Sequence, residues 1–469
     1  MKEGEYELAK SSRNKFNSLL KEALLAAKPS KNEMDAAKFA INTIMGRLKV
    51  KAPKNVEILL AGSVARGTQV RGNSDIDIFL LFPRSTKESA IEKKGLAIGK
   101  SIVKKENNES YIVKYAEHPY TRIFWKNSGV SIDIVPAYKI ESAKERITAV
   151  DRTQLHNEFV NSNLTERQRD EVRILKSFLK AHNIYGAEAK IDGFSGYLCE
   201  LLIYHYGSFL NAITGIANAK LPTIIDVSKG KRENIDEEMA MKRFGRNLIV
   251  IDPTDSNRNV AANVSDESLF RFALISRDLL QSPTKENFYG KWDSFEEEEK
   301  RLANTRDMLG ADLYVLHFDV PEIAEDIIWQ QLKKTRLRLN ELVTTGGFKP
   351  IISLQNTDDR NAIIGLFVSH THVSVSKIIG PSLNMGDAAE HFMKAHRKAL
   401  LISIDKDRMY AIEKARYTTP EALIRGFLKS GRKEFPSYLS PGKATLYVNK
   451  VPEKHAKLLY MSFTTKFSI

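Results

Sequence analysis

Cysteine is nearly absent from this chain of 469 residues, because Cys199 is the only one. A single cysteine cannot form an intramolecular disulfide and cannot build a zinc site based on several thiolates. Apolar runs are short as well: no stretch of about eighteen apolar residues exists, which excludes a membrane-spanning helix. The first residues are acidic and lack the apolar segment of a signal peptide. Together these absences predict a reducing, cytoplasmic environment.

Negative charge is the minority sign, with 58 Asp and Glu against 72 Lys and Arg and a net charge of +14. An excess of this size favours a polyanionic partner such as nucleic acid. A basic surface that only maintains solubility would have the same composition, so charge leaves both interpretations open. The sequence also lacks internal repeats and low-complexity linkers, and its length suits about two to four globular domains.

The first 150 residues show the pattern of a small α/β domain. The second of two helical segments begins with a capping box, formed by Ser30 and Glu33. The last two of the strand-like runs that follow are joined by residues 126–129 (Lys-Asn-Ser-Gly), a hairpin signal. We therefore predict a mixed or antiparallel sheet in residues 1–150. Its strands are expected at 56–61, 76–82, 111–116, 122–125 and 130–135.

Residues 151–287 are mostly helical in pattern, whereas residues 288–469 mix strands and helices. In the latter part a strand, a long helix from Pro321 and two further strands follow in the order β-α-β-β, which suggests a ferredoxin-like domain. A strand at 409–415 and a helix entered at 419–421 form a tail. The predicted fold class is a multidomain α+β protein: a mixed-sheet domain, a helical part, a ferredoxin-like body and an α/β tail. The three body strands are expected at 314–320, 350–354 and 363–375.

A glycine and a serine, Gly62 and Ser63, follow the first predicted strand and are expected to open a helix. Glycine lets backbone N–H groups approach an anion closely, and a helix N-terminus favours negative charge. Ser63 adds a hydroxyl donor, and Arg66 adds a cation one turn later. This stretch is a plausible cradle for a triphosphate, although a Gly-Ser pair also occurs in many ordinary turns.

Two aspartates, Asp75 and Asp77, lie two residues apart on the next predicted strand, so their side chains share one face. Ile76 and Ile78 point to the other face. A third carboxylate, Asp133, alternates with isoleucines in the same way on a later strand. Adjacent carboxylates repel one another, and Mg²⁺ prefers oxygen ligands, so a divalent cation would relieve the repulsion. The alternative is a set of solvated aspartates at a strand edge.

Three carboxylates with a phosphate cradle suit phosphoryl transfer by two metal ions about 3.5–4 Å apart. One ion would lower the pKa of an RNA 3′-hydroxyl, and the other would neutralise the leaving pyrophosphate. No separate general base is required, since positioning and charge stabilisation do most of the work. We expect Asp75 and Asp77 to bind both ions, and Asp133 to complete the site that faces the primer.

These residues resemble the polymerase β-like nucleotidyltransferase superfamily, whose pattern is Gly-Ser, a Gly-Thr or similar, then Asp-x-Asp. That pattern leaves poly(A) polymerases, oligoadenylate synthetases and several small-molecule transferases open. Four further segments resemble the archaeal, class I CCA-adding enzymes. The resemblance is strong from about residue 30 to 275, and near the C-terminus it includes mainly residues 417–421. The four segments are 148–156, 184–188, 193–202 and 252–263.

The resemblance implies a fold of head (1–150), neck (151–287), body and tail (288–469). It implies an enzyme that adds C, C and A from CTP and ATP to the 3′ end of tRNA, without a nucleic-acid template and with Mg²⁺. It also implies that the acceptor end of tRNA is held by the body and tail, and that the protein is a monomer or a homodimer. The positions that match the family's nucleotide contacts are Ser63, Arg66, His156, Lys176, Tyr185 and, for the base, Arg258.

The residues themselves support these roles less sharply. Lys176 lies beside apolar helix residues and could neutralise a phosphate, but a surface lysine would look the same. His156 and Tyr185 could bind a nucleotide or simply pack. Arg258 could read a base edge or cap a helix.

Three rival functions remain open. A poly(A) polymerase or another enzyme that adds tails to RNA would share the aspartates and the cradle. An RNA-binding protein with an inactive site would share the charge, although all three carboxylates are intact here. A nucleotidyltransferase that acts on small molecules would not need the large basic C-terminal half.

Overall fold

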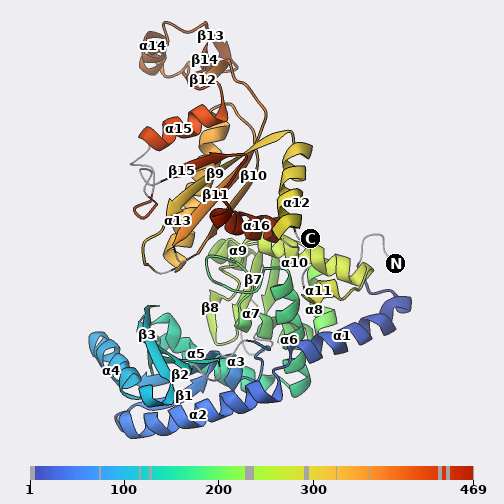
Figure 1. The fold of residues 1–469 in the computed structure, drawn as a ribbon, viewed down its shortest axis with the longest axis vertical. Helices are drawn as coiled ribbons and strands as arrows, with labels where there is room; N and C mark the ends of the chain where they lie inside the picture. The colour runs from blue at the N-terminus through green and yellow to red at the C-terminus, as the bar shows by residue number, and fades with distance from the viewer. Residues whose placement is uncertain are drawn as a thin grey trace. The chain divides into compact units, whose positions relative to one another are not determined.

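The computed structural model describes residues 6–72, 75–115, 118–125, 129–227, 237–289, 295–323, 325–358, 360–430, 436–439 and 444–467 (Figure 1). The chain divides into two compact units, residues 1–291 and residues 292–468. Both mix helices with β-sheets, as the sequence predicts for a multidomain α+β protein. No helix in these ranges is long and apolar enough to cross a membrane.

A five-stranded sheet forms the base of the first unit, with the strand order β1-β2-β5-β4-β3. The pair β2/β5 is parallel and the other pairs are antiparallel, which confirms the predicted mixed sheet. The hairpin residues 126–128 lie outside the described residues. The strands are β1 (Glu57–Ala61), β2 (Asp75–Phe82), β3 (Glu109–Tyr115), β4 (Pro119–Trp125) and β5 (Val130–Tyr138).

One face of this sheet is apolar and is covered by α2 (Lys31–Lys51) and α4 (Glu88–Ser101). Ile76 and Ile78 of β2 are fully buried there, packed with isoleucines of β5 and with Ile44 and Leu48 of α2. Because side chains alternate along a strand, the aspartates of β2 and β5 must lie on the opposite face. Burial of the isoleucines therefore fixes the direction in which the carboxylates point.

Helix α2 begins with the predicted capping box: the Glu33 N–H donates to the Ser30 hydroxyl, and the Ser30 N–H donates to the Glu33 carboxylate over 2.7 Å. The other oxygen of Glu33 accepts the Gly72 N–H at 2.9 Å. One carboxylate thus caps a helix and anchors the segment that leads into β2 and its aspartates.

A helical layer follows in the same unit. Its core contains many aromatic side chains, with Phe178, Phe209 and Phe272 fully buried. The main helices are α1 (Arg13–Ala27), α5 (Thr153–Asn163), α6 (Glu166–Ala181), α7 (Gly196–Tyr206), α8 (Phe209–Ala217) and α10 (Asp266–Gln281). The short ones are η1 (Lys10–Ser12), α3 (Gly62–Ala65), η2 (Lys105–Asn107), η3 (Ala143–Glu145), η4 (Ala149–Arg152), α9 (Glu237–Phe244) and α11 (Glu286–Tyr289).

A small sheet that the helical pattern did not predict lies within this layer. It has the order β6-β7-β8, with β6 (Thr223–Asp226), β7 (Leu248–Asp252) and β8 (Asp255–Asn259). Every residue of β7 is buried, so this strand shows a continuous apolar run rather than the alternation of a half-exposed strand. A run of that length cannot be distinguished from a buried helix segment by periodicity.

The second unit contains a sheet of order β10-β11-β9-β15, antiparallel throughout. Along the chain, α13 follows the first strand of this sheet, β9, and α15 lies between the third and fourth strands, β11 and β15. This is the βαββαβ order of a ferredoxin-like fold, as predicted. Helices α13 and α15 pack on one face, and α12 and α16 on the other. The elements are α12 (Phe295–Met308), β9 (Ala311–Asp319), α13 (Glu325–Thr345), β10 (Pro350–Thr357), β11 (Asn361–Ser369), α15 (Pro420–Ser430), β15 (Thr445–Val448) and α16 (Glu453–Phe467).

A smaller subdomain is inserted between β11 and α15. It consists of β12 (Val375–Ser382), α14 (Gly386–Ala395), β13 (Leu401–Asp405) and β14 (Arg408–Lys414), with the sheet order β12-β14-β13. The predicted strand at 363–375 therefore ends earlier than expected, at Ser369 of β11, and its last residue, Val375, begins β12 in a different sheet. The helix predicted for the tail, α15, packs on the body sheet instead, because Ile424 and its neighbours fill that core.

Candidate active site

The predicted aspartates lie in one row across the first sheet. Asp77 of β2 is directly opposite Asp133 of β5, while Ala61 of β1 stands opposite Asp77 on its other side. Asp75 is opposite Ser131, whose hydroxyl donates to an Asp75 oxygen. The structure therefore brings all three carboxylates to the same face of neighbouring strands, and Ser131 orients one of them.

Burial and mutual repulsion perturb this row. Burial, followed by the charges of Asp133 and Asp75, raises the pKa of Asp77 to about 7, although Arg66 and Arg122 act in the opposite direction. Carboxylates that repel one another in a partly buried site are a suitable donor set for a hard divalent cation. The chemistry of these residues therefore fits a metal site.

Arg122 is a member of the row that the sequence analysis missed. It stands opposite Asp133 on β4, and its guanidinium donates to both carboxylate oxygens, over 2.7 Å from Nε and 2.6 Å from Nη2. The predicted hairpin of strands 122–125 and 130–135 contained the signal for this pair, since a four-residue connection places Arg122 opposite Asp133.

The cradle predicted at Gly62 and Ser63 does open a helix, α3. Gly62 has a φ of +74°, and a Cβ at that position would lie 1.9 Å from Oδ2 of Asp77. Only glycine fits between the end of β1 and the carboxylate row. The Ser63 side chain is half-buried beside this contact.

Arg66 leads from the cradle into a buried network of charges. Its Nε lies 3.0 Å from Oε2 of Glu200 on α7, which also accepts a short hydrogen bond from the Thr68 hydroxyl. Lys176 of α6 lies on the other side of Glu200, at 3.4 Å, and donates to the Thr68 carbonyl at 3.1 Å. Two cations hold the pKa of Glu200 below its usual range, although burial acts in the opposite direction.

Lys176 was expected to contact the nucleotide, and the structure places its ammonium group inside the protein, 1% exposed. Glu200 was not predicted at all. The signal was a single carboxylate in an otherwise apolar and aromatic helix segment, Tyr197–Ile203, where a charge requires a buried partner. Nearby, a Cβ at Gly196 would contact both the Tyr185 hydroxyl and the Lys176 amine, so these two groups converge at the start of α7.

The loop after the cradle is held by α6 as well. Arg173 donates to the carbonyl oxygens of Gly67 and Gln69, and Lys176 donates to that of Thr68 between them. Three successive carbonyls are thereby bound by two side chains from adjacent turns of one helix. The cradle is consequently fixed to the helical layer and not only to its own sheet.

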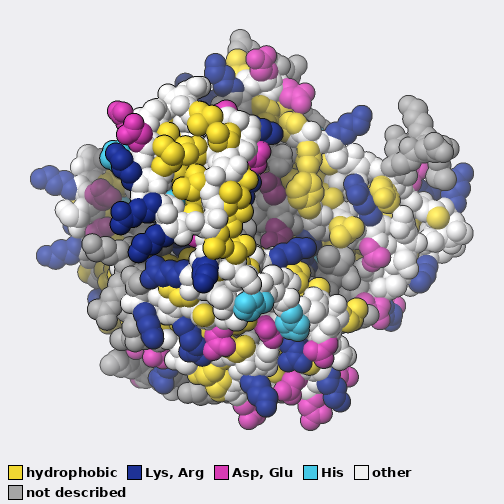
Figure 2. Space-filling view, turned by 90° about the horizontal axis from the view of Figure 1, so that it is seen from above, with side chains coloured by type: hydrophobic (Ala, Val, Ile, Leu, Met, Phe, Trp, Pro, Cys, Tyr) yellow, Lys and Arg dark blue, Asp and Glu magenta, His cyan; other side chains and the backbone are white. Residues whose placement is uncertain are grey.

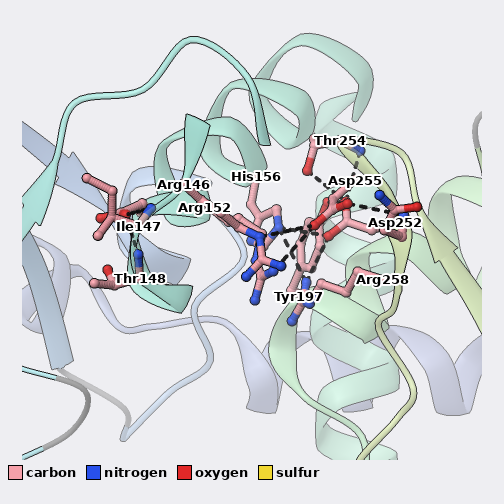
Figure 3. Close-up of polar contacts among 12 residues, drawn as sticks. Arg146, Ile147, Thr148, Arg152, His156, Tyr197, Asp252, Thr254, Asp255 and Arg258 are labelled. Carbon is pink, nitrogen blue, oxygen red and sulfur yellow. Dashed lines mark hydrogen bonds and ion pairs between the residues drawn. The ribbon is translucent and has the colours of Figure 1, made fainter. Parts of the chain in front are cut away.

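A second cluster is centred on Asp252, at the end of β7 (Figure 3). Its carboxylate accepts from Arg258 at 2.8 Å, from Tyr197 at 3.2 Å and from Thr254 at 2.8 Å, and lies 3.0 Å from Nε2 of His156. The His156 and Tyr197 rings are stacked, with centroids 3.9 Å apart. The predicted residues His156 and Arg258 are thus brought together by Asp252 and Tyr197, which the sequence analysis did not select.

The charges in this cluster shift its titration. Burial lowers the pKa of His156, while the hydrogen bond to Asp252 and the charge of Asp252 act in the opposite direction. Burial alone would raise the pKa of Asp252, but His156 and Arg258 hold it well below its usual range. The Arg258 side chain remains 31% exposed, so its guanidinium is fixed by Asp252 and still open to a ligand.

Another group could hold a metal by geometry alone. In the described part of the chain, three ligand atoms within 4.8 Å of one another occur at Glu88, Glu92 and His118, on α4 and at the start of β4. Nδ1 of His118 lies 3.4 Å from Glu92, as in an ordinary ion pair. This group is not part of the aspartate row.

Comparison with known proteins covers nearly the whole chain. Three family models match: a nucleotidyltransferase domain at residues 41–156, the second domain of tRNA nucleotidyltransferase at 170–289, and the C-terminal domain of CCA-adding enzymes at 309–435.

Curated relatives match over similar lengths. The CCA-adding enzyme of Archaeoglobus fulgidus is 34% identical over 88% of this chain and 90% of its own. The CCA-adding enzyme of Methanocaldococcus jannaschii is 34% identical over 90% of this chain and 93% of its own length. That of Sulfurisphaera tokodaii is 34% identical over 86% of this chain and 90% of its own length. With the aspartate row in place and full-length relatives above 30% identity, the chain belongs to the family of CCA-adding enzymes.

Proposed function

We propose that this protein adds C, C and A to the 3′ end of tRNA, using CTP and ATP and releasing pyrophosphate, without a nucleic-acid template. The observation that carries the proposal is the row of Asp75, Asp77 and Asp133 beside the Gly62 cradle. It stands in a chain that matches a nucleotidyltransferase domain, the second domain of tRNA nucleotidyltransferase and the C-terminal domain of CCA-adding enzymes. A nucleotidyltransferase needs this combination of carboxylates and a phosphate site.

Asp75, Asp77 and Asp133 would hold the metal ions, which we take to be Mg²⁺ because all the donors are carboxylate oxygens. When bound, the ions would supply an activated 3′-hydroxyl and charge neutralisation at the pyrophosphate. Ser131 orients Asp75 by its hydrogen bond. The isoleucines behind the row are buried in the core, which sets the face on which the carboxylates lie before substrates arrive.

The nucleotide would bind between the two clusters. The Ser63 hydroxyl and the Arg66 guanidinium would contact the triphosphate, and Arg66 is held in place by Glu200. His156 and Tyr185 would line the same site, with Lys176 enclosed behind it. Arg258 would present N–H donors to the base, with its orientation set by Asp252. Lys176 acts mainly as a charge behind the cradle, since its amine is enclosed.

The second unit would contact the RNA. In its small sheet, Val375, Ile379 and Leu401 are exposed on the same face as Lys377 and Lys414. Figure 2 shows apolar side chains gathered beside Lys and Arg on the face seen from above. Apolar and cationic groups together suit the sugars and phosphates of RNA.

The domain division follows from this function. We assign residues 1–150 to a catalytic head, 151–287 to a neck that contacts nucleotide and RNA, and 288–469 to a body and tail that hold the acceptor end. A cytoplasmic location and a monomeric or homodimeric state stay predictions.

A primer-extension assay tests the proposal. The purified protein is given Mg²⁺ and a tRNA that ends at its discriminator base, with CTP alone, ATP alone, or both. Growth by two nucleotides with CTP and by three with both would establish CCA addition. A long ladder with ATP alone would indicate a poly(A)-type polymerase instead, and no extension under any condition would indicate an RNA-binding protein.

A further inference from the structure

Both oxygens of the third carboxylate are already occupied in this structure. Arg122 donates to Oδ1 and Oδ2 of Asp133 at once, in the planar paired geometry that gives the strongest ion pairs. The two side chains are 20% and 9% exposed, so water screens the pair only in part. A cation that binds Asp133 must therefore share or displace these hydrogen bonds.

The pairing of the nearby cations points to the same two residues, Arg122 and Asp133. Two cations lie close enough to the aspartates to act on their charge: Arg66 and Arg122. Arg66 is already paired with the buried Glu200. Arg122 is therefore the cation that neutralises the row without a competing anionic partner of its own among the contacts described.

The register explains why Arg122 can do this. Asp77, Asp133 and Arg122 are consecutive partners on β2, β5 and β4, so their side chains stand side by side on one face. Asp133 thus has a carboxylate on one side and a guanidinium on the other. In this arrangement the three aspartates do not bring one carboxylate oxygen each to within 4.8 Å of the other two. Among the described residues, only Glu88, Glu92 and His118 bring three possible ligand atoms that close together.

We propose that Arg122 is the resident counterion of the aspartate row: it holds Asp133 in the metal-free protein and yields at least one of its oxygens when a divalent cation binds beside Asp77. This inference rests on the proposed function, because it takes Asp77 and Asp133 as metal ligands. Arg122 is a positioning residue, since it acts through Asp133. Its positive charge opposes the arriving cation, so it also sets how tightly the empty enzyme binds metal.

The effect of Arg122 on metal affinity is measured by titrating the full-length protein with Mn²⁺ in the absence of nucleotide. The concentration of free Mn²⁺ is determined from its electron paramagnetic resonance signal. We expect Arg122→Gln to bind Mn²⁺ at least about tenfold more tightly than the wild type, because a like charge paired with one of the ligands is removed. Arg122→Lys keeps the charge and should bind within about threefold of the wild type. Asp133→Asn should weaken binding.

Thermal unfolding in chelator and in Mn²⁺ is the second measurement. Arg122→Gln should melt lower than the wild type in chelator and recover much of the difference in Mn²⁺, because the metal replaces the missing charge. A variant that folds only with Mn²⁺ would support the inference in the same way. A variant that unfolds with or without Mn²⁺ would assign the pair to fold stability and overturn it.

The controls separate two kinds of failure. If Asp133→Asn weakens Mn²⁺ binding but Arg122→Gln binds as the wild type does, or more weakly, the metal ligands stand and the counterion role is wrong. If Asp133→Asn and Asp77→Asn both bind Mn²⁺ as the wild type does, the metal assignment itself is wrong, and the counterion role fails with it.

Discussion

The ammonium group of Lys176 lies 3.4 Å from Oε1 of Glu200, and the protein encloses both side chains. Glu200 also pairs with Arg66, so one carboxylate compensates two cations from different elements. Such a buried network is stable only while every charge keeps a partner. Because Arg66 and Thr68 follow Gly62 and Ser63 in the chain, this network joins the stability of the first unit to the geometry of the candidate site.

Replacing Glu200 by Gln removes this compensation while keeping the shape. Two cations would then be buried without a counterion, and we expect the first unit to lose about 3–5 kcal/mol of unfolding free energy. Urea denaturation followed by circular dichroism measures the loss. Glu421→Gln, which breaks the exposed pair with Arg425, is the matched control and should change stability by less than about 1 kcal/mol. Equal effects of the two substitutions would show that the network is not stabilising.

Gly62→Ala should slow catalysis about a hundredfold or more without unfolding the protein. The added Cβ would lie 1.9 Å from Oδ2 of Asp77, so the carboxylate or the cradle must move. A shift of about 1 Å at reacting groups can slow a reaction about a hundredfold. Single-turnover extension of tRNA measures the rate.

Gly72→Ala is the control for this substitution. Gly72 has the same φ of +74° but nothing within 4 Å of an added Cβ, so it shares the backbone strain without the clash. We expect Gly72→Ala to lose stability of about 1–2 kcal/mol while retaining most of the rate. A similar loss of rate in both variants would assign the effect to strain alone.

The aspartate row should make the metal-free protein less stable as the pH rises. The pKa of Asp77 is about 7 in the folded state against 3.8 ordinarily, so between these values the folded state binds the additional proton. Stability therefore falls from about pH 4 to pH 7 and levels off above, by at most on the order of 4 kcal/mol. Urea unfolding in chelator, compared between wild type and Asp77→Asn, isolates this contribution; an identical pH slope in both proteins would contradict it.

Arg258→Lys should reduce base selectivity more than it reduces the overall rate. Lysine retains the charge near Asp252 but loses the planar fork of donors that can read a base edge. We expect incorporation of UTP or GTP, relative to CTP and ATP, to rise by about tenfold or more. Competition assays with mixed nucleotides measure the ratio, and Arg167→Lys on the exposed side of α6 serves as the control. Unchanged selectivity would remove Arg258 from base recognition.

The aspartate row could be predicted because it depends on local alternation. Asp75 and Asp77 alternate with isoleucines, and Asp133 does so on its own strand, so each strand alone shows which side chains face the core. The ferredoxin-like order of the body followed in the same way from consecutive elements, and the pairing of Arg122 with Asp133 was contained in the hairpin register.

The supporting residues could not be predicted from local patterns. Glu200 contacts Thr68 and Arg66, which lie more than 130 positions away in the chain, and Asp252 contacts His156 at a separation of 96. Such partners are set by how α6, α7 and β7 pack, and not by periodicity. The burial of Lys176 has the same origin, since one lysine on an amphipathic helix looks like any other until the neighbouring helix is placed.

The hold of α6 on residues 67–69 has a mechanical consequence. Arg173 and Lys176 bind three successive carbonyl oxygens there, partly in the dry interior where a lost hydrogen bond is not replaced by water. These bonds tie residues 67–69 to α6, so we expect the end of the site next to Gly62 and this helix to move together. Any adjustment during successive additions would then have to come from the RNA end, which would move against a segment that α6 holds in place.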